Sequence, residues 1–221
     1  MQFIFGFLGK KLFTPLFVLL LATSANASSI VTGEDGYRLW LKYDLINDHN
    51  KRQAYQNQLA NWQVLGQSST AQVIRDELEY AFTGLFGKTS KSMSIRSTNL
   101  LVGTFAELQK QLPKIKLAGE QVNAEGYLIK QVSYQGKKLL LVAADTDVGA
   151  LYGTFHLIRL VQMGEKLADI NLVSNPKTKL RVLNHWDNPD RHVERGFAGQ
   201  SIWDWHKLPD YHYQKYTDYA R

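Results

Sequence analysis

The residues from Leu183 to Trp205 concentrate side chains that could form a binding site. This stretch, LNHWDNPDRHVERGFAGQSIWDW, holds three of the five Trp of the chain, three Asp and the adjacent Glu194 and Arg195. A Trp ring offers a flat apolar face for stacking, and its N–H seeks a hydrogen-bond partner. Neighbouring carboxylate and guanidinium groups supply charged partners for hydroxyl and acid groups. The composition therefore indicates a sugar site, and a Trp-rich turn that closes a hydrophobic core is the alternative.

Other site chemistries lack their motifs in this sequence. His185, His192 and His206 lie near several Asp, but they show no HExxH or other tight ligand spacing. A Ser/His/Asp hydrolase of the nucleophile-elbow type needs G-x-S-x-G, and a phosphate loop needs GxxxxGK[ST] or GxGxxG. None of these is present. We therefore expect neither a metal nor a cofactor.

Three runs within the stretch carry a family resemblance. Residues 184–188 (NHWDN), 194–199 (ERGFAG) and 201–205 (SIWDW) resemble the opening of the catalytic barrel in glycoside hydrolase family 67, the xylan α-1,2-glucuronidases. The resemblance implies removal of glucuronic acid, or its 4-O-methyl ether, from glucuronic-acid-substituted xylo-oligosaccharides. It also implies inversion at the sugar carbon, which uses two carboxyl groups about 6.5 to 9.5 Å apart.

The same resemblance suggests which residues would contact the sugar. Glu194 and Arg195 would make polar contacts to the uronic sugar, and Trp186 or Trp203 would form a stacking wall, with Asp187 beside them. Two alternatives stay open. Asp187 and Arg195 could form a buried ion pair that orders the loop, and Trp203 could be barrel packing.

The family's general acid and base lie on later barrel strands, beyond the position that matches Arg221. We therefore assign no catalytic residue to this chain and expect it to be inactive by itself. One local departure concerns Pro189-Asp190-Arg191-His192, where many family members have a hydrophobic residue followed by Asp-Gly-Thr. This departure leaves the positions of Asp190 and His192 open.

Composition and charge exclude several classes of protein. The 221 residues are 44% hydrophobic and 21% charged, which is typical of a globular chain and not of a disordered one. The net charge of +6 comes from interspersed Lys and Arg rather than from a basic face, so nucleic acid is not an expected partner. Without Cys, the chain must depend on its core and not on disulfides.

Residues 1–27 have the pattern of a secretory signal peptide. Lys10 and Lys11 precede an apolar run from Leu12 to Ala22, and residues 25–27 (Ala-Asn-Ala) form a small-residue cleavage site. The run falls short of the roughly 18 to 20 residues that a membrane span requires. We expect a secreted or periplasmic protein without a membrane anchor, and an uncleaved anchor is the alternative.

Hydrophobic periodicity predicts the elements of an α/β domain. Residues 70–86 predict an amphipathic helix with a capping box at Ser69 and Gln72, ended by Gly87. Residues 100–104 predict a strand and 105–112 a short helix. Residues 126–134 and 137–144 predict a hairpin, whose second strand is apolar on both faces and so should lie inside the sheet.

The polar residues 49–63, with Tyr55, Leu59 and Trp62 at helical spacing, predict a surface helix. The buried face of helix 70–86 is expected to consist of Val73, Ile74, Leu78, Ala81, Phe82, Leu85 and Phe86.

A second long helix is predicted from Asp145 or Thr146 to about Met163, with Gly164 after its end. Gly149 and Gly153 each cost about 1 kcal/mol of helix propensity relative to Ala, so a close approach of the helix to the sheet should offset them. The expected buried stripe is Val148, Leu151, Tyr152, Phe155 and Ile158.

Residues 125–127 and 144–153 resemble the α/β domain that precedes the barrel in glucuronidases and β-hexosaminidases, where it is structural. Asp145 and Asp147 are therefore expected to serve the fold. Residues 170–176 should be extended and end at a domain boundary, and residues 180–184 should form the first strand of a (β/α)8 barrel.

The predicted organisation is a signal peptide (1–27), an α-glucuronidase N-terminal α/β domain with a mixed sheet and helices (28–178), and the first strand and loop of an incomplete TIM barrel (179–221). A complete barrel needs about 250 residues. The expected function is that of an N-terminal portion of a secreted α-glucuronidase. A non-catalytic carbohydrate-binding or structural fragment is the alternative, and a homodimer of the complete enzyme stays open.

Overall fold

The computed structural model describes residues 43–88, 90–92, 94–117, 122–182, 184, 186–195 and 200–220. The predicted signal segment 1–27 lies outside them. The elements in chain order are α1 (His49–Leu59), β1 (Asn61–Val64), α2 (Ser69–Phe86), β2 (Ser90–Lys91), β3 (Leu100–Thr104), α3 (Phe105–Gln111), β4 (Tyr127–Tyr134), β5 (Lys137–Ala144), α4 (Asp147–Gln162), β6 (Asn171–Ser174), β7 (Trp186–Asp187), β8 (Val193–Arg195) and α5 (Gln214–Ala220).

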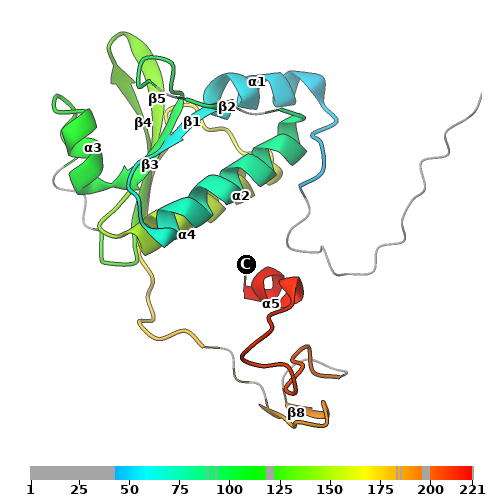
Figure 1. The fold of residues 1–221 in the computed structure, drawn as a ribbon. Helices are drawn as coiled ribbons and strands as arrows, with labels where there is room; N and C mark the ends of the chain where they lie inside the picture. The colour runs from blue at the N-terminus through cyan, green and yellow to red at the C-terminus, as the bar shows by residue number, and fades with distance from the viewer. Residues whose placement is uncertain are drawn as a thin grey trace, which may run out of the picture. The chain divides into compact units, whose positions relative to one another are not determined.

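Six strands form one mixed sheet in the order β2-β1-β3-β5-β4-β6. Strands β2, β1, β3 and β5 run parallel, while β4 is antiparallel to both β5 and β6. Helices α2 and α4 lie on one side of the sheet and α3 lies on the other (Figure 1). The predicted mixed sheet with covering helices is therefore confirmed.

Strand β5 faces two hydrophobic cores at once. Leu140, Val142 and Ala144 point into the core shared with α1, α2 and α4. Leu139 and Leu141 point into the core shared with α3. The strand from Leu139 to Ala144 is buried on both faces, because it lies between β3 and β4 with helices above and below. The prediction of an interior strand is confirmed.

The predicted hairpin turn has the expected backbone. Gln135 and Gly136 connect β4 to β5 with φ angles of 51° and 81°. Two successive residues with positive φ define a type I′ turn, whose twist matches that of the flanking strands. The register that follows pairs Tyr134 with Lys137 and continues to Leu128 opposite Ala143.

Helix α2 matches the predicted range, but its cap and its buried face differ in detail. The hydroxyl of Ser68, not of Ser69, accepts a hydrogen bond from the Ala71 N–H at 3.0 Å. Val73 is 46% exposed, so its predicted burial is wrong. Glu77 is buried instead, because its carboxylate accepts a hydrogen bond from the Tyr43 hydroxyl at 2.6 Å. Gly87 ends the helix in the left-handed conformation, as predicted.

The predicted helix over residues 49–63 is shorter than expected. It ends at Leu59, and Trp62 lies in strand β1, paired with Leu100 of β3. The Trp62 side chain is 1% exposed. The helical spacing between Leu59 and Trp62 was therefore misleading. Trp62 is buried because its strand pairs with β3, whose residues lie far away in the sequence.

Helix α4 begins after Thr146, whose hydroxyl accepts the Gly149 N–H, and it approaches the sheet through its glycines. A Cβ on Gly149 would lie 2.4 Å from the Gly126 carbonyl oxygen, and one on Gly153 would lie 2.6 Å from Val142 Cγ1. Real Cβ atoms do not approach so closely, so the predicted close packing is confirmed.

The predicted apolar stripe of α4 is mostly wrong. Val148 and Tyr152 are each 39% exposed, and of the five predicted residues only Ile158 is buried. The buried residues are Gly149, Ala150, Gly153, Thr154, Leu157, Ile158 and Val161. The small residues lie at the centre of the contact face, which turns the larger neighbours on the flanks toward solvent.

The expected barrel strand over residues 180–184 does not form among the described residues 180–182 and 184, none of which is in a strand. Leu180 and Val182 are 76% and 73% exposed. An apolar strand requires hydrogen-bonded neighbours, and these residues pair with no strand of the described chain. Arg181 instead contacts the α/β domain, where its guanidinium donates to the Glu125 carboxylate and lies 5.6 Å from the Tyr152 ring centroid.

Across the residues that the structure describes, no helix combines the length and apolar character that crossing a membrane would require.

Substituting Gly153→Ala should destabilise the protein by about 1–3 kcal/mol, because the added Cβ meets Val142 and Tyr127, although Ala favours helix by about 1 kcal/mol. Val148→Ala on the same helix should stay within about 0.5 kcal/mol of the parent, since Val148 is exposed. Urea denaturation of both variants measures this difference. A Gly153→Ala variant as stable as the parent would contradict the close approach.

Stability should fall as the pH drops, with a contribution from His156. Its Nδ1 lies 2.7 Å from the Tyr127 hydroxyl, and its pKa is lowered by burial and secondarily by Arg159. The unfolded chain therefore takes up this proton first, so the contribution of His156 to stability is complete above about pH 6.5 and is lost as the pH falls through the folded-state pKa. The free energy of unfolding of His156→Gln, measured between pH 7 and 5, should fall less steeply than that of the parent. The exposed His49→Gln is the matched control, and equal slopes for His156→Gln and the parent would refute the assignment.

Candidate functional site

The Trp-rich stretch forms a short antiparallel hairpin. Strands β7 and β8 pair Trp186 with Arg195 and Asp187 with Val193, with an irregularity between Trp186 and Asp187. Glu194 and Arg195 are placed by their backbone on β8. The hairpin thus brings four of the five predicted site residues onto two neighbouring strands, which the sequence spacing alone did not establish.

The turn of the hairpin contains the residues that depart from the family pattern. The Asn188 N–H donates to the His192 carbonyl at 2.9 Å, and the Arg191 N–H donates to the Asn188 carbonyl at 2.8 Å. The Asp190 carboxylate accepts the His192 N–H at 3.0 Å. Arg191 has a φ of 72°, in the left-handed region. Asp190 therefore closes the turn, and His192 is exposed.

Ser201 joins three parts of the stretch. Its hydroxyl donates to the Asp187 carboxylate and accepts a hydrogen bond from the backbone N–H of Trp203 at 3.0 Å. Its own N–H donates to the Arg191 carbonyl at 3.0 Å, and the side chain is 1% exposed. Ser201 thus holds the hairpin against the chain that carries Trp203. Sequence reasoning missed this role, although Ser201 begins the third family-like run.

Arg191 was a second residue without a predicted role. Its Nη2 donates to the Ser201 carbonyl at 3.2 Å. Its Nε is buried and has no hydrogen-bond partner among the described residues. The left-handed backbone of Arg191 and this side-chain contact together direct the turn toward Ser201.

Trp203 is held by an aromatic cluster on the C-terminal side. Its ring lies 4.7 Å from the Tyr216 ring of α5, tilted by 45°. The Tyr216 hydroxyl accepts the Asp204 N–H at 2.7 Å, which connects the helix to the same turn. Tyr216 is 8% exposed. This packing favours the interpretation that Trp203 serves structure.

Lys207 adds a positive charge to the edge of this cluster. It lies 3.6 Å from the Asp204 carboxylate, donates to the Tyr213 hydroxyl and stands 5.0 Å from the Tyr213 ring centroid. The hydrogen bond to Tyr213 and, to a smaller extent, the charge of Asp204 raise the pKa of Lys207. The ammonium group therefore stays protonated, and it orders the turn between Asp204 and α5.

Trp186 differs from Trp203 in its surroundings. The Trp186 side chain is 50% exposed, whereas Trp203 is partly covered by Tyr216. An exposed indole beside a hydrogen-bonded carboxylate is suited to stack on a sugar ring. Of the two predicted stacking residues, Trp186 is therefore the better placed.

The arrangement suits binding more than acid–base chemistry. Asp187 uses a carboxylate oxygen to accept the Ser201 hydroxyl, so it orders the loop in this structure. Among the described residues, no cluster of three or more His, Asp or Glu could hold a metal ion.

Two models of one glycosyl hydrolase family match this chain, and they meet within α4. The model described as "Glycosyl hydrolase family 67 N-terminus" matches residues 39–157. The model described as "Glycosyl hydrolase family 67 middle domain" matches residues 160–221. The chain therefore belongs to glycosyl hydrolase family 67.

Several curated relatives are named α-glucuronidases. Alpha-glucuronidase A of Emericella nidulans is 31% identical over 202 residues, covering 86% of this chain and 22% of the relative. Alpha-glucuronidase A of Aspergillus tubingensis is 27% identical over 201 residues, covering 88% and 22%. Probable alpha-glucuronidase A of Neosartorya fischeri is 27% identical over 195 residues, covering 85% and 21%. The chain thus spans about a fifth of the length of the relatives that it matches.

Among solved structures, a family GH115 4-O-methyl-alpha-glucuronidase with specificity for decorated arabinogalactans matches with a TM-score of 0.36 and 22% identity. The match covers 46% of this chain and 13% of that one.

Replacing Ser201→Ala should loosen the turn, because the Asp187 carboxylate and the Trp203 N–H both lose a buried partner. A loss of about 1–3 kcal/mol corresponds to roughly 5-fold to 150-fold faster hydrogen exchange at the Trp203 backbone amide. Exchange measured by NMR tests this. The control Gln200→Ala alters an exposed neighbour and should leave the rate unchanged. An unaltered Trp203 rate in Ser201→Ala would show that Ser201 does not join these loops.

Proposed function

We propose that this chain is the N-terminal part of an α-glucuronidase that hydrolyses α-1,2-linked glucuronic acid, or its 4-O-methyl ether, from xylo-oligosaccharides. Membership of glycosyl hydrolase family 67 supports the reaction class. The names of the relatives support the sugar. The observation that carries the role of this chain is the half-exposed Trp186 on a hairpin braced by Ser201.

In this proposal the hairpin forms one wall of the substrate pocket. Trp186 stacks on the sugar, while Glu194 and Arg195 on β8 supply polar contacts to its hydroxyl and carboxylate groups. Asp187 takes part through the loop that it orders with Ser201. Trp203 supports the wall from behind by packing on Tyr216.

The proposed role of this chain does not include the catalytic carboxyl groups. An inverting glycosidase places an acid and a base about 6.5 to 9.5 Å apart on either side of the bond. The family resemblance assigns both to barrel strands that come later than the matched residues. The role of this chain is therefore to bind and orient the sugar, and we expect it to be inactive by itself.

The proposal extends to the organisation and location of the protein. Residues 1–27 would direct export, residues 28–178 would form the accessory domain, and residues 179–221 would begin a (β/α)8 barrel with the hairpin at the active-site end. The protein would be secreted or periplasmic. A homodimer of the complete enzyme is compatible with this organisation.

A non-catalytic carbohydrate-binding chain is the second candidate. The exposure of Trp186 and Trp205 favours it, because exposed indole faces can contact a sugar without any catalytic group. The two candidates agree on sugar binding by the hairpin, so they separate only in whether this segment completes an active site when joined to the rest of the barrel.

Two measurements test the proposal. The 221-residue chain should release no 4-O-methylglucuronic acid from aldouronic acids above a heat-inactivated control, and turnover would overturn the placement of the catalytic groups. In titrations followed by tryptophan fluorescence, Trp186→Ala should weaken oligosaccharide binding about tenfold, since a lost aromatic contact costs about 0.5–1.5 kcal/mol beyond buried area. Trp205→Ala, which removes a similarly exposed indole, is the matched control. Equal losses in both variants would refute a specific wall at Trp186.

A further inference from the structure

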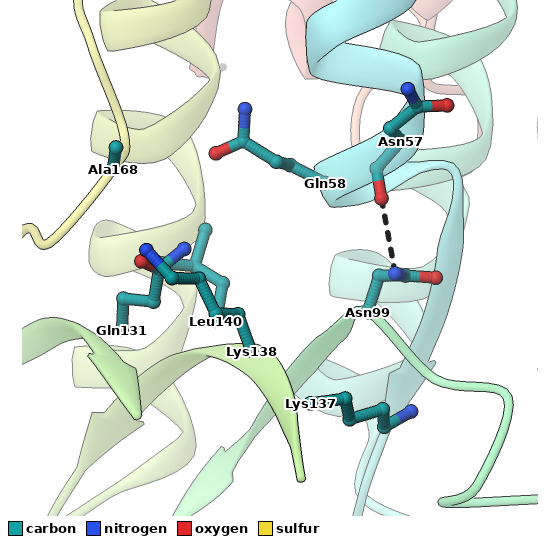
Figure 2. Close-up of a pocket in the computed structure, with 8 residues that line it drawn as sticks. All are labelled: Asn57, Gln58, Asn99, Gln131, Lys137, Lys138, Leu140 and Ala168. Carbon is teal, nitrogen blue, oxygen red and sulfur yellow. Dashed lines mark hydrogen bonds between the residues drawn. The ribbon is translucent and has the colours of Figure 1, made fainter. Parts of the chain in front are cut away.

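A polar pocket lies on the α/β domain, at the end of α1. Its volume is about 420 Å³, within the range of small-molecule sites. Figure 2 shows its lining side chains, which come from the end of α1, from the residue before β3, from β4 and β5, and from the loop before β6. The lining residues are Asn57, Gln58, Asn99, Gln131, Lys137, Lys138, Leu140 and Ala168.

The side chains that line the pocket are mostly carboxamides and ammonium groups. Four residues carry carboxamides and two carry ammonium groups, and the pocket has no carboxylate among its lining residues. Leu140 provides an apolar floor and is 3% exposed. A carboxamide donates and accepts at once, as a sugar hydroxyl does, so the lining matches a polyhydroxylated ligand.

Some of these groups are occupied by the fold. The Asn99 amide donates to the Asn57 carbonyl at 3.0 Å, drawn as a dashed line in Figure 2. Lys137 donates to three carbonyl oxygens, at 2.6 to 3.1 Å, and its side chain runs away from Gln131 and Lys138 in Figure 2. Asn99 and Lys137 therefore build the pocket rather than meet a ligand.

Other groups keep hydrogen-bonding capacity for a ligand. Among the described residues, Gln131 uses its oxygen to accept the Asp169 N–H at 3.0 Å, which leaves its NH₂ as a donor. Gln58 donates through its Nε2 to the Ala54 carbonyl at 3.1 Å, which leaves its oxygen as an acceptor. Figure 2 shows Gln58 reaching from α1 toward the loop that carries Ala168.

Lys138 provides a positive charge that a ligand can recruit. It lies 3.1 Å from the Asp169 carboxylate, and the two side chains are 62% and 84% exposed. An ion pair so exposed contributes little and exchanges readily with solvent. A ligand carboxylate can therefore share or replace Asp169 as the partner of Lys138.

The electrostatics of α1 restrict the kind of anion. Asn57 and Gln58 lie in the last turn of α1, where the helix carbonyls carry partial negative charge. A phosphate or sulfate in the centre of the pocket would be repelled there, whereas hydroxyl groups would donate to these oxygens. The geometry favours a ring of hydroxyls near α1 with a single carboxylate at the opposite rim.

We propose that this pocket is a second carbohydrate site that binds one uronic acid ring of a substituted oligosaccharide. Gln58 and Gln131 hold the hydroxyls, and Lys138 holds the carboxylate. The choice of a uronic acid rests on the proposed function, while the preference for a hydroxylated ligand rests on the pocket itself. Because no aromatic side chain lines the pocket, binding is weak, with a dissociation constant on the order of 1 mM.

The test is an NMR titration of the 221-residue chain with an aldouronic acid and with the unsubstituted xylo-oligosaccharide of the same length. The acidic sugar should shift the side-chain amide signals of Gln58 and Gln131 and the backbone signal of Leu140. It should bind about fivefold or more tightly than the neutral sugar, in keeping with a charge-assisted contact. Equal affinity for the two sugars, or no shift at these residues, would overturn the proposal.

Two variants separate ligand binding from a purely structural ion pair. Lys138→Gln should reduce affinity for the acidic sugar to the level of the neutral one. Asp169→Asn removes the competing carboxylate and should keep or strengthen binding, and Asn tolerates the φ of 58° at this position. If the pair served only the fold, the two variants would behave alike, and the proposal would fail.

The outcome is distinguishable from that of the proposed function. Shifts at Trp186 and Trp203 with unchanged Gln58 and Gln131 would leave the hairpin role intact and overturn the second site. Shifts in the pocket with an unaffected hairpin would support the second site and remove the proposed wall at Trp186. The absence of signal shifts in both regions would overturn both proposals.

Discussion

The burial of β5 on both faces is the constraint on which the α/β domain depends. An apolar strand with no polar face is stable only between two neighbouring strands and beneath helices on each side. Leu139 to Ala144 obtain this from β3, β4 and the helices that form two cores. The tight Gln135–Gly136 turn sets the register of β4 against β5, and the helices cover the two apolar faces of β5.

The close contact between α4 and the sheet follows from the same constraint. A helix that covers a flat apolar strand packs most closely where its own side chains are smallest, and Gly149 and Gly153 provide that surface. The loss of helix propensity at two glycines is offset by the packing of Val142 and its neighbours against the helix backbone. This contact also explains why Val148 and Tyr152 lie at the edge of the interface and not inside it.

The hairpin segment is organised by polar contacts instead of by a core. Ser201 connects Asp187, Arg191 and Trp203 through hydrogen bonds, and Tyr216 packs on Trp203. A site held in this way leaves the Trp186 side chain exposed, because the loop gains its order from hydrogen bonds around the buried Ser201 and not from burying every aromatic ring. The α/β domain and the hairpin therefore use different physical means to position their side chains.

The sequence by itself determined the features that local chemistry controls. Period-two and helical patterns, a two-residue turn and helix caps act over a few neighbours, so α2, α4 and the β4–β5 hairpin were predictable, as was the family from three short runs near Trp186. Only the tertiary structure decided which partners distant residues meet. Trp62 became a strand residue because β3 completes its sheet, and Ser201 became the link to Asp187 because the chain returns to the hairpin. These contacts join residues far apart in sequence, and no local pattern encodes such a meeting.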